Sequence, residues 1–186
     1  MTSKCIIAAL PEELEGATEL LGLPVYFSGV GKINAAIAAQ KAIDRGYTDI
    51  INIGSCGSLK HPAGHLIAVG AVWQDIDGSP LCPYGETPFE ENSACIILNE
   101  DYPDACFTTD YFYDAAQRAK YSEHYLRQIQ TCSAFDMECF AIAKACQRAG
   151  VKFSAYKWVS DDGDKGSWEE NCQIGLAAFL ELMKTR

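Results

Sequence analysis

Apolar and polar positions form two kinds of pattern along the chain. Short, nearly continuous apolar runs bounded by turn residues predict buried strands. They cover residues 4–10, 25–28, 49–54, 66–76, 94–99, 106–110 and 152–160. Longer stretches with apolar residues three or four positions apart predict helices over 11–21, 32–45, 112–130, 138–149 and 168–183. This order of elements predicts an α/β fold, with a mixed or mainly parallel sheet covered by helices on both faces.

Proline and glycine mark several boundaries between these elements. Pro11 suits the first turn of a helix, where its missing N–H costs nothing, and the acidic residues that follow it suit the positive end of the helix dipole. We expect Gly22 to end this helix and Gly70 to introduce a bulge or bend into its strand. The proline-containing residues 78–93 are expected to form the main loop region.

Three of the predicted helices carry apolar residues at helical spacing. These residues are Ile33, Ala36, Ile37 and Ile43 in the second helix, Cys139, Ile142, Ala143 and Cys146 in the fourth, and Cys172, Leu176, Phe179, Leu180 and Met183 in the last. The last set is expected to face inward. Gly46 and Gly150 are expected to cap the second and fourth helices.

The composition is that of a globular protein, and it limits the class of partner. A chain of 186 residues, 48% hydrophobic and 22% charged, predicts one domain covering residues 1–186. The net charge of −10 argues against a nucleic-acid or anionic-membrane partner, because phosphate contacts need clustered Lys and Arg. No apolar run reaches the ~18 residues of a membrane helix, and the first apolar stretch is too short for a signal peptide, so we expect a cytoplasmic protein.

The nine cysteines do not form a recognisable metal or disulfide pattern. Their number is odd, their spacing is irregular and no CxxC pair occurs, so zinc-ribbon and thioredoxin-like sites are not expected. Most have apolar neighbours and are expected to be small buried hydrophobic residues in a reducing compartment. The three histidines are scattered, and we expect no metal site and no cofactor.

Several polar residues fall where predicted strands end or predicted helices begin, and the ends of strands meet at one edge of an α/β sheet. They are Glu12, Glu13, Ser55, Asp110, Asp136, Glu138 and Asp161. Taken singly, an acid at a helix start is more often a cap than a catalyst. Ser55 is expected in a glycine-flanked loop, where it could donate to an oxygen of a ligand but is more often an ordinary turn residue. The turn Gly29-Val30-Gly31-Lys32 matches neither the dinucleotide-binding motif nor the P-loop.

Six segments in this order resemble the nucleoside phosphorylase/nucleosidase superfamily: LPEEL, SGVGKINAA, INIGSCGSL, TTDYFYD, FDMEC and VSDDGD. The branch that they resemble most is that of the 5'-methylthioadenosine/S-adenosylhomocysteine nucleosidases. The resemblance implies a three-layer α/β/α sandwich around a mixed, barrel-like sheet. It also implies cleavage of the N-glycosidic bond of a purine nucleoside, through a state in which positive charge grows on the sugar.

The resemblance also implies a role for each matching residue. Glu13 would deprotonate the attacking water, Glu138 would hold the ribose hydroxyls and Asp161 would protonate the purine at N7. The implied substrate-binding residues are Leu10 and Val30 beside the 5' substituent, Ser55 near the water, Phe112 and Tyr113 at the base, Met137 at the sugar face, and Ser160 before the acid. A general acid and a general base each contribute roughly 10²–10⁴-fold to a rate.

Two positions favour hydrolysis over phosphorolysis. Where the related phosphorylases carry an arginine this chain has Asn52, and where they carry a phosphate-binding glycine loop it has Leu10-Pro11-Glu12-Glu13. A carboxylate there would repel phosphate. The sequence of the Ser55-Cys56-Gly57 motif is nevertheless closer to that of the phosphorylases, so a phosphorylase stays an alternative.

The chain departs from the resembled family in ways that leave its substrate open. It is shorter than typical members, and a strand hairpin is expected to be missing between Gly22 and Val25. Phosphorolysis, another N-riboside substrate and a non-catalytic nucleoside-binding protein therefore remain alternatives. The segment 84–89 keeps the YGxxP spelling of a loop that closes the neighbouring subunit's site in the family, so the resemblance implies a homodimer with Pro88 and Phe89 near the partner's site.

Overall fold

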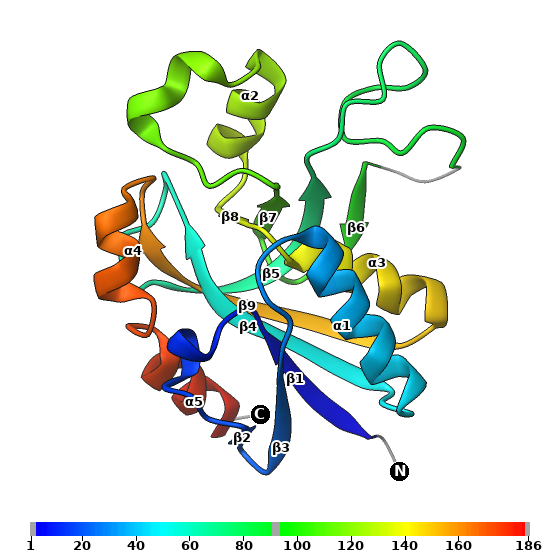
Figure 1. The fold of residues 1–186 in the computed structure, drawn as a ribbon, viewed down its shortest axis with the longest axis vertical. Coiled ribbons are helices and arrows are strands. Elements are labelled where there is room, and N and C mark those ends of the chain that lie inside the picture. The colour runs from blue at the N-terminus through cyan, green and yellow to red at the C-terminus, as the bar shows by residue number, and fades with distance from the viewer. Residues whose placement is uncertain (1–2, 91–93, 185–186) are drawn as a thin grey trace.

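The computed structural model describes residues 3–90 and 94–184. Three strands form its centre: β1 (Lys4–Ala8), β4 (Asp49–Gly57) and β9 (Lys152–Asp161). β4 pairs in parallel with β1 on one side and with β9 on the other (Figure 1). Their near-continuous apolar runs suit strands that are covered on both faces.

Five strands close into a barrel. β9 pairs with β5 (Leu66–Gln74), β5 with β7 (Asp104–Thr108), β7 with β8 (Ala134–Asp136), and β8 returns to β4. The closing contact sets Gly57 opposite Phe135, and a Cβ on Gly57 would lie 1.9 Å from the Phe135 ring. The barrel can therefore close here only because Gly57 has no side chain.

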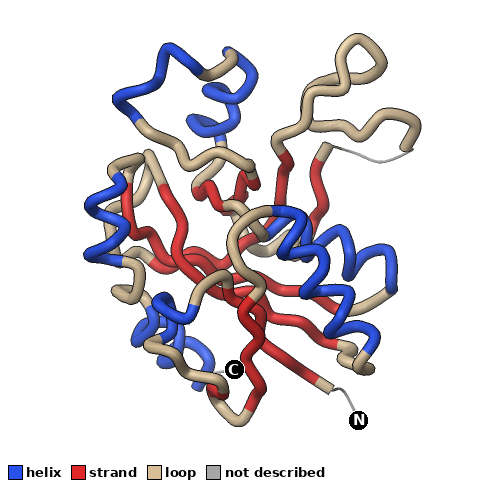
Figure 2. Tube along the Cα trace, in the orientation of Figure 1, coloured by secondary structure: helices blue, strands red, loops and turns tan. Residues whose placement is uncertain are grey.

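Helices lie on both faces of the sheet where β1, which is not part of the barrel, pairs with the central strands (Figure 2). On β1, Cys5 and Ile7 pack with α1 (Lys32–Asp44) and α3 (Cys139–Ala149), while Ile6 and Ala8 face the cluster that contains Phe179 of α5 (Leu176–Lys184). Alternate residues of one strand thus serve two cores, as the period of two requires. This arrangement confirms the expected three-layer α/β fold around a barrel-like sheet.

The other strands complete the sheet at its two edges. β6 (Cys95–Ile97) pairs with β5, and β3 (Leu23–Phe27) pairs with β1. All seven predicted strands are present, with ends displaced by a few residues. The register of β5 shifts between Val69 and Ala71, which confirms the bulge expected at Gly70.

The helix predicted over 11–21 is wrong. Only one 3-10 turn forms, η1 (Pro11–Leu14), and Glu15 ends it in the left-handed region at φ 53°. The chain then forms a hairpin, in which β2 (Glu19–Leu20) pairs antiparallel with β3. Leu21 and Gly22 both have positive φ and make the tight turn, so Gly22 does not cap a helix. A short hairpin over residues 19–27 therefore includes the stretch from Gly22 to Val25, where a strand hairpin was expected to be missing.

Two predicted helices are each broken in two. The stretch 112–130 forms η2 (Ala115–Lys120) and α2 (Glu123–Thr131), because Ser122 starts a new helix by accepting the N–H of Tyr125. The stretch 168–183 forms α4 (Lys165–Asn171) and α5. Gly175 separates them by packing against the Trp158 side chain, at a distance that leaves no room for a Cβ. Strand β8 was not predicted, since three residues give too short a pattern.

The buried face of α1 also differs from the expected stripe. Ala35, Ala39 and Ala42 are buried, whereas Ile33 is 78% exposed and Ile37 is 49% exposed. Small alanines let α1 lie close to β1 and α3, and this close packing outweighs the preference of isoleucine for the interior. The stripes of α3 and of the last helical segment do face the core as predicted.

The cysteines are mostly core residues, as expected. Cys82 and Cys95 are half-buried, and the remaining seven, Cys5, Cys56, Cys106, Cys132, Cys139, Cys146 and Cys172, are buried. Within the described ranges, no helix has both the length and the apolar character needed to cross a membrane.

Candidate active site

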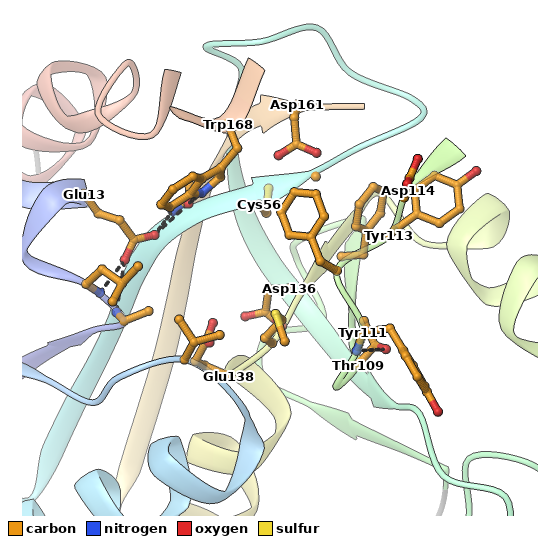
Figure 3. A pocket seen from close by; sticks show the side chains of 18 of the residues that line it. Glu13, Cys56, Thr109, Tyr111, Tyr113, Asp114, Asp136, Glu138, Asp161 and Trp168 are labelled. Atoms are coloured by element: carbon orange, nitrogen blue, oxygen red, sulfur yellow. Dashed lines mark hydrogen bonds between the residues drawn. The ribbon is translucent and has the colours of Figure 1, made fainter. Parts of the chain in front are cut away.

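A cavity of about 520 Å³ opens where the barrel strands end. Its walls come from segments directly after β1, β7 and β8 and from the last residues of β4 and β9. In α/β folds, the carboxyl ends of strands gather ligand sites in this way. Figure 3 shows acidic and aromatic side chains from these separate segments directed into one space.

Most of the residues singled out from the sequence line this cavity. They are Leu10, Glu13, Val30, Ser55, Phe112, Tyr113, Met137, Glu138 and Asp161. Ser160 lies behind the wall, where its Oγ donates to Asp161 Oδ2 at 2.8 Å. In the part of the chain that the structure describes, Pro88 and Phe89 stand apart from this lining, and Phe89 is 94% exposed.

Glu13 is buried but fully satisfied by hydrogen bonds. Its Oε2 accepts the N–H groups of Ala9 and Leu10, both at 3.1 Å. Its Oε1 accepts the N–H and the hydroxyl of Ser55, both at 2.7 Å. Four donors replace the water that burial removes, so the protein stabilises a negative charge at this position.

Gly54 allows the close approach of Glu13 to β4. A Cβ on Gly54 would lie 2.8 Å from Glu13 Oε1, nearer than real Cβ contacts come. Ser55 belongs to β4 and not to a loop, contrary to expectation, and this rigid strand presents both of its donors to Glu13.

Glu138 precedes α3 and reaches back to the turn before α1. Its Oε1 accepts the N–H of Gly31 at 2.9 Å, and the residue is 6% exposed. Burial, together with the nearby Asp136 carboxylate, raises the pKa of Glu138 to about 7, while Lys157 acts in the opposite direction. At neutral pH this carboxyl therefore divides between its protonated and ionised forms.

Asp161 ends β9 and is 6% exposed. Burial raises the pKa of this carboxyl above its usual value, although hydrogen bonds from the Gly163 N–H and the Ser160 hydroxyl oppose the shift. Asp162 and Asp164 add to the rise through their charge. The protonated form of Asp161 is thus more accessible than that of an exposed aspartate.

A buried ion pair lies under the cavity floor. Lys157 Nζ is 2.8 Å from Asp136 Oδ2, and both side chains are almost inaccessible to water. Asp136 also accepts the hydroxyl of Thr108 and the N–H of Cys139. Burial works against the Lys157 charge, but the Asp136 carboxylate, together with Cys139, Glu138 and Cys106, outweighs it, and the pKa of Lys157 lies well above its usual value.

Asp136 also belongs to the group that most resembles a metal site among the described residues. The ligand atoms of Cys106, Asp136 and Cys139 lie within 4.8 Å of one another. Burial raises the pKa of the Cys106 thiol well above its usual value, which disfavours the thiolate that binds metals. The Lys157 ammonium already balances the Asp136 charge, so we assign no metal to this group.

An aromatic wall closes the side of the cavity opposite Glu13 (Figure 3). Tyr113 is buried and meets Phe135 edge to face, with ring centroids 5.4 Å apart. Gly163 packs flat on the Tyr113 ring, where a Cβ would lie 2.6 Å from the nearest ring carbon. Phe112 is 42% exposed and offers a flat apolar surface suited to stacking on a heterocycle.

Sequence reasoning did not select several lining residues. They are Ala9, Cys56, Gly57, Thr109, Tyr111, Asp114, Phe135, Asp136, Gln117 and Trp168. Asp136 was noted only as an acid at the start of a predicted helix, and Trp168 only as the start of the last one. Aromatic residues at helical spacing usually belong to the core, so the sequence carried no signal for Trp168.

Among the described residues, no Lys or Arg lines the cavity, and its Asp and Glu side chains are the only ones there that can carry a full charge near neutral pH. These residues are Glu13, Asp114, Asp136, Glu138 and Asp161. Asn52, at the position where an arginine was considered, lies outside the lining as described and donates its amide to Ile7 O at 3.0 Å.

The family model described as the Phosphorylase superfamily matches residues 17–185. The chain belongs to this superfamily. The 5'-methylthioadenosine/S-adenosylhomocysteine nucleosidase of an Exiguobacterium species is 28% identical to it, over 90% of this chain and 77% of its own length. The Bacillus subtilis protein of the same name is 26% identical, over 91% and 77%. The superfamily expected from the six motifs is therefore confirmed.

Solved structures show the same fold. The futalosine hydrolase of Helicobacter pylori superimposes with a TM-score of 0.81 and 21% identity, covering 98% of this chain and 96% of that one. A 5'-methylthioadenosine/S-adenosylhomocysteine nucleosidase of the same organism, solved with butyl-thio-DADMe-Immucillin-A, gives 0.80 and 22%, covering 100% and 97%. These two proteins of the same fold differ in the substrate that their names state.

Proposed function

We propose that this protein hydrolyses the N-glycosidic bond of a purine nucleoside and releases the free base. The observation that carries the proposal is the pairing of two unlike carboxyls across one cavity. Glu13 is surrounded by donors that stabilise its charge, whereas burial favours the protonated form of Asp161. A general base and a general acid require this difference.

In the proposed reaction, Glu13 accepts a proton from the attacking water. The water oxygen bonds to the anomeric carbon while the bond from that carbon to the purine nitrogen breaks. The electron pair of the broken bond moves to the purine, which takes the Asp161 proton at N7 and leaves neutral. Acidic side chains around the sugar also stabilise the positive charge that grows on it.

The remaining residues hold the substrate in place. Glu138, with its backbone partner Gly31, is proposed to grip the ribose hydroxyls, and Met137 to pack on the sugar face. Phe112 is proposed to stack on the base and the Tyr113 backbone to read its edge. Leu10 and Val30 border the proposed 5' end of the cavity, and Ser160 orients Asp161.

Water is the proposed nucleophile because the lining repels anions. Two carboxylate-sized charges 4 Å apart repel by about 1–4 kcal/mol in environments between water and a protein surface. The described lining has no Lys or Arg to bind phosphate, and the donors around Glu13 hold a negative charge at the position of the proposed water. The names of the curated relatives also support a hydrolase, and we propose a 5'-thio-substituted adenosine as the substrate.

The first test uses a panel of nucleosides with and without phosphate. We expect 5'-methylthioadenosine to release adenine in phosphate-free buffer together with an equal amount of free sugar, both measured by chromatography. Adenosine 5'-monophosphate should be a poor substrate because the lining repels its phosphate. Obligatory phosphate dependence with a sugar 1-phosphate product would refute hydrolysis, and release from inosine compounds alone would refute the adenosine preference.

We also propose that two copies of the chain form the working enzyme. Phe89 is almost wholly exposed and has a positive φ of 62°, while the adjacent Glu90 is anchored to Lys144 and Arg148 of α3 at 2.6 Å. Ile33 adds a second exposed apolar side chain at the start of α1. These features suit a surface that is covered by a partner subunit, whose loop brings Pro88 and Phe89 to the cavity.

Light scattering at micromolar concentration should give a mass near twice 20.3 kDa. Phe89→Ala should lower kcat/KM by about 10-fold, since truncating an aromatic anchor at an interface typically costs more than 1 kcal/mol. Leu81→Ala is the matched control, because Leu81 is also exposed but lies eight positions earlier in the same loop region. A fully active monomer would contradict the proposal.

A further inference from the structure

Trp168 is linked through Ser55 to Glu13, the candidate general base, and this link joins distant parts of the chain. Its indole Nε1 donates to Ser55 Oγ at 3.0 Å, and Ser55 Oγ in turn donates to Glu13 Oε1 at 2.7 Å. Trp168 belongs to α4, Ser55 to β4 and Glu13 to η1. Figure 3 shows the indole beside Glu13, at the same end of the cavity.

The chemistry of the three groups gives this chain of hydrogen bonds one direction. An indole N–H only donates, an ionised carboxylate only accepts, and a serine hydroxyl has one proton and two lone pairs. The Trp168 N–H occupies a lone pair of Ser55 Oγ, so the single proton of that hydroxyl is directed to Glu13. Each bond in such a chain polarises the next and strengthens it.

The position of Trp168 is not explained by core packing. The side chain is only half-buried, and it belongs to none of the four hydrophobic clusters of the described residues. Trp158 provides the contrast, because it is fully buried in a cluster and donates its N–H to Cys172 O. The indole of Trp168 lines the cavity, and core packing alone does not account for that position.

We propose that Trp168 is a positioning residue, which holds the Ser55 hydroxyl on Glu13 and thereby keeps that carboxylate in the orientation that accepts the proton of the attacking water. The inference rests on the proposed hydrolase function. It predicts that the indole N–H contributes to the rate in addition to the volume of the ring. A phenyl ring at this position would still line the cavity, but it could not donate a hydrogen bond to Ser55.

The test compares Trp168→Phe with the wild-type enzyme. Loss of one neutral hydrogen bond should lower kcat by about 3- to 10-fold, with KM within about twofold. Trp73→Phe is the matched control, since Trp73 lies outside the described lining and packs against the cluster around Phe107.

Ser55→Ala provides the second arm. If Trp168 acts through Ser55, the double variant should lose no more activity than Ser55→Ala alone. Additive losses would overturn the inference, as would a Trp168→Phe variant with an unchanged kcat. A rise in KM without a fall in kcat would also overturn it, because a wall that only binds substrate produces that pattern.

A readout independent of activity separates this inference from the hydrolase proposal. In protein labelled with ¹⁵N, the indole N–H signal that Trp168→Phe removes should shift in Ser55→Ala, while the two other indole signals stay in place. If the wild-type protein releases no base but this shift is seen, the proposed function fails and the contact stands. If base is released and the signal does not shift, the contact fails and the function stands.

Discussion

Asp161→Asn is expected to lower the single-turnover rate of base release by at least about 10²-fold, as for the loss of a general acid. Asparagine keeps nearly the size of the side chain and its hydrogen-bonding edge, so the dissociation constant for substrate should change little. Rate and affinity measured together therefore separate a lost proton donor from a lost binding contact.

Neighbouring acids supply the controls for Asp161. Asp162 and Asp164 are exposed, whereas Asp161 is 6% exposed and lines the cavity. Asn at either neighbouring position should cost far less than at Asp161. A near-normal rate in Asp161→Asn combined with a large loss in Asp162→Asn would show that the acid has been assigned to the wrong residue.

The stability of Asp161→Asn provides a further check. The pKa of Asp161 is higher in the folded than in the unfolded protein, so the group favours folding at low pH and this contribution is lost as pH rises through its folded value. A neutral amide removes that dependence. At neutral pH the variant should therefore be at least as stable as the wild type, and unfolding cannot account for its low rate.

The sequence predicted well those features that depend on local pattern. The apolar runs of β1, β4 and β9 identify buried strands without any knowledge of their neighbours, and Gly150 marks the end of α3 in the expected left-handed conformation. The strand-end acids Glu13 and Asp161 meet in one cavity because β1 and β9 run parallel to β4, which lies between them, so their carboxyl ends share an edge of the sheet.

The features that the sequence did not predict depend on tertiary contacts. The hairpin after η1 needs a left-handed Leu21, a conformation that no propensity for leucine would predict. The interruption at Gly175 follows from the bulk of Trp158 on another element. The contact of Trp168 with Ser55 joins residues 113 positions apart, so only the folded chain shows it.

Lys157 is the clearest case of such a tertiary effect. In sequence it lies within an alternating strand, where a lysine usually points to water. Closure of the barrel instead brings Lys157 to Asp136 on β8 and buries both side chains. The unpredicted strand β8 supplies the partner, so the ion pair could not be inferred before β8 was known.

Lys157→Met is expected to lower the free energy of unfolding by about 3–5 kcal/mol, because it leaves the Asp136 charge buried without its partner. That is a large part of the roughly 5–15 kcal/mol by which domains are stable. Urea unfolding at neutral pH measures the effect. Lys152→Met is the matched control, since Lys152 is exposed and lies 3.9 Å from its partner Asp49, so its removal should cost less than about 1 kcal/mol.

A second substitution distinguishes a lost charge partner from a lost packing contact in Lys157→Met. The double variant Lys157→Met, Asp136→Asn should recover much of the loss at neutral pH, because it leaves no unpaired buried charge. A cavity left by poor packing would instead cost the same in both variants. If the double variant is as unstable as Lys157→Met alone, the ion pair is not what Lys157 contributes to this barrel.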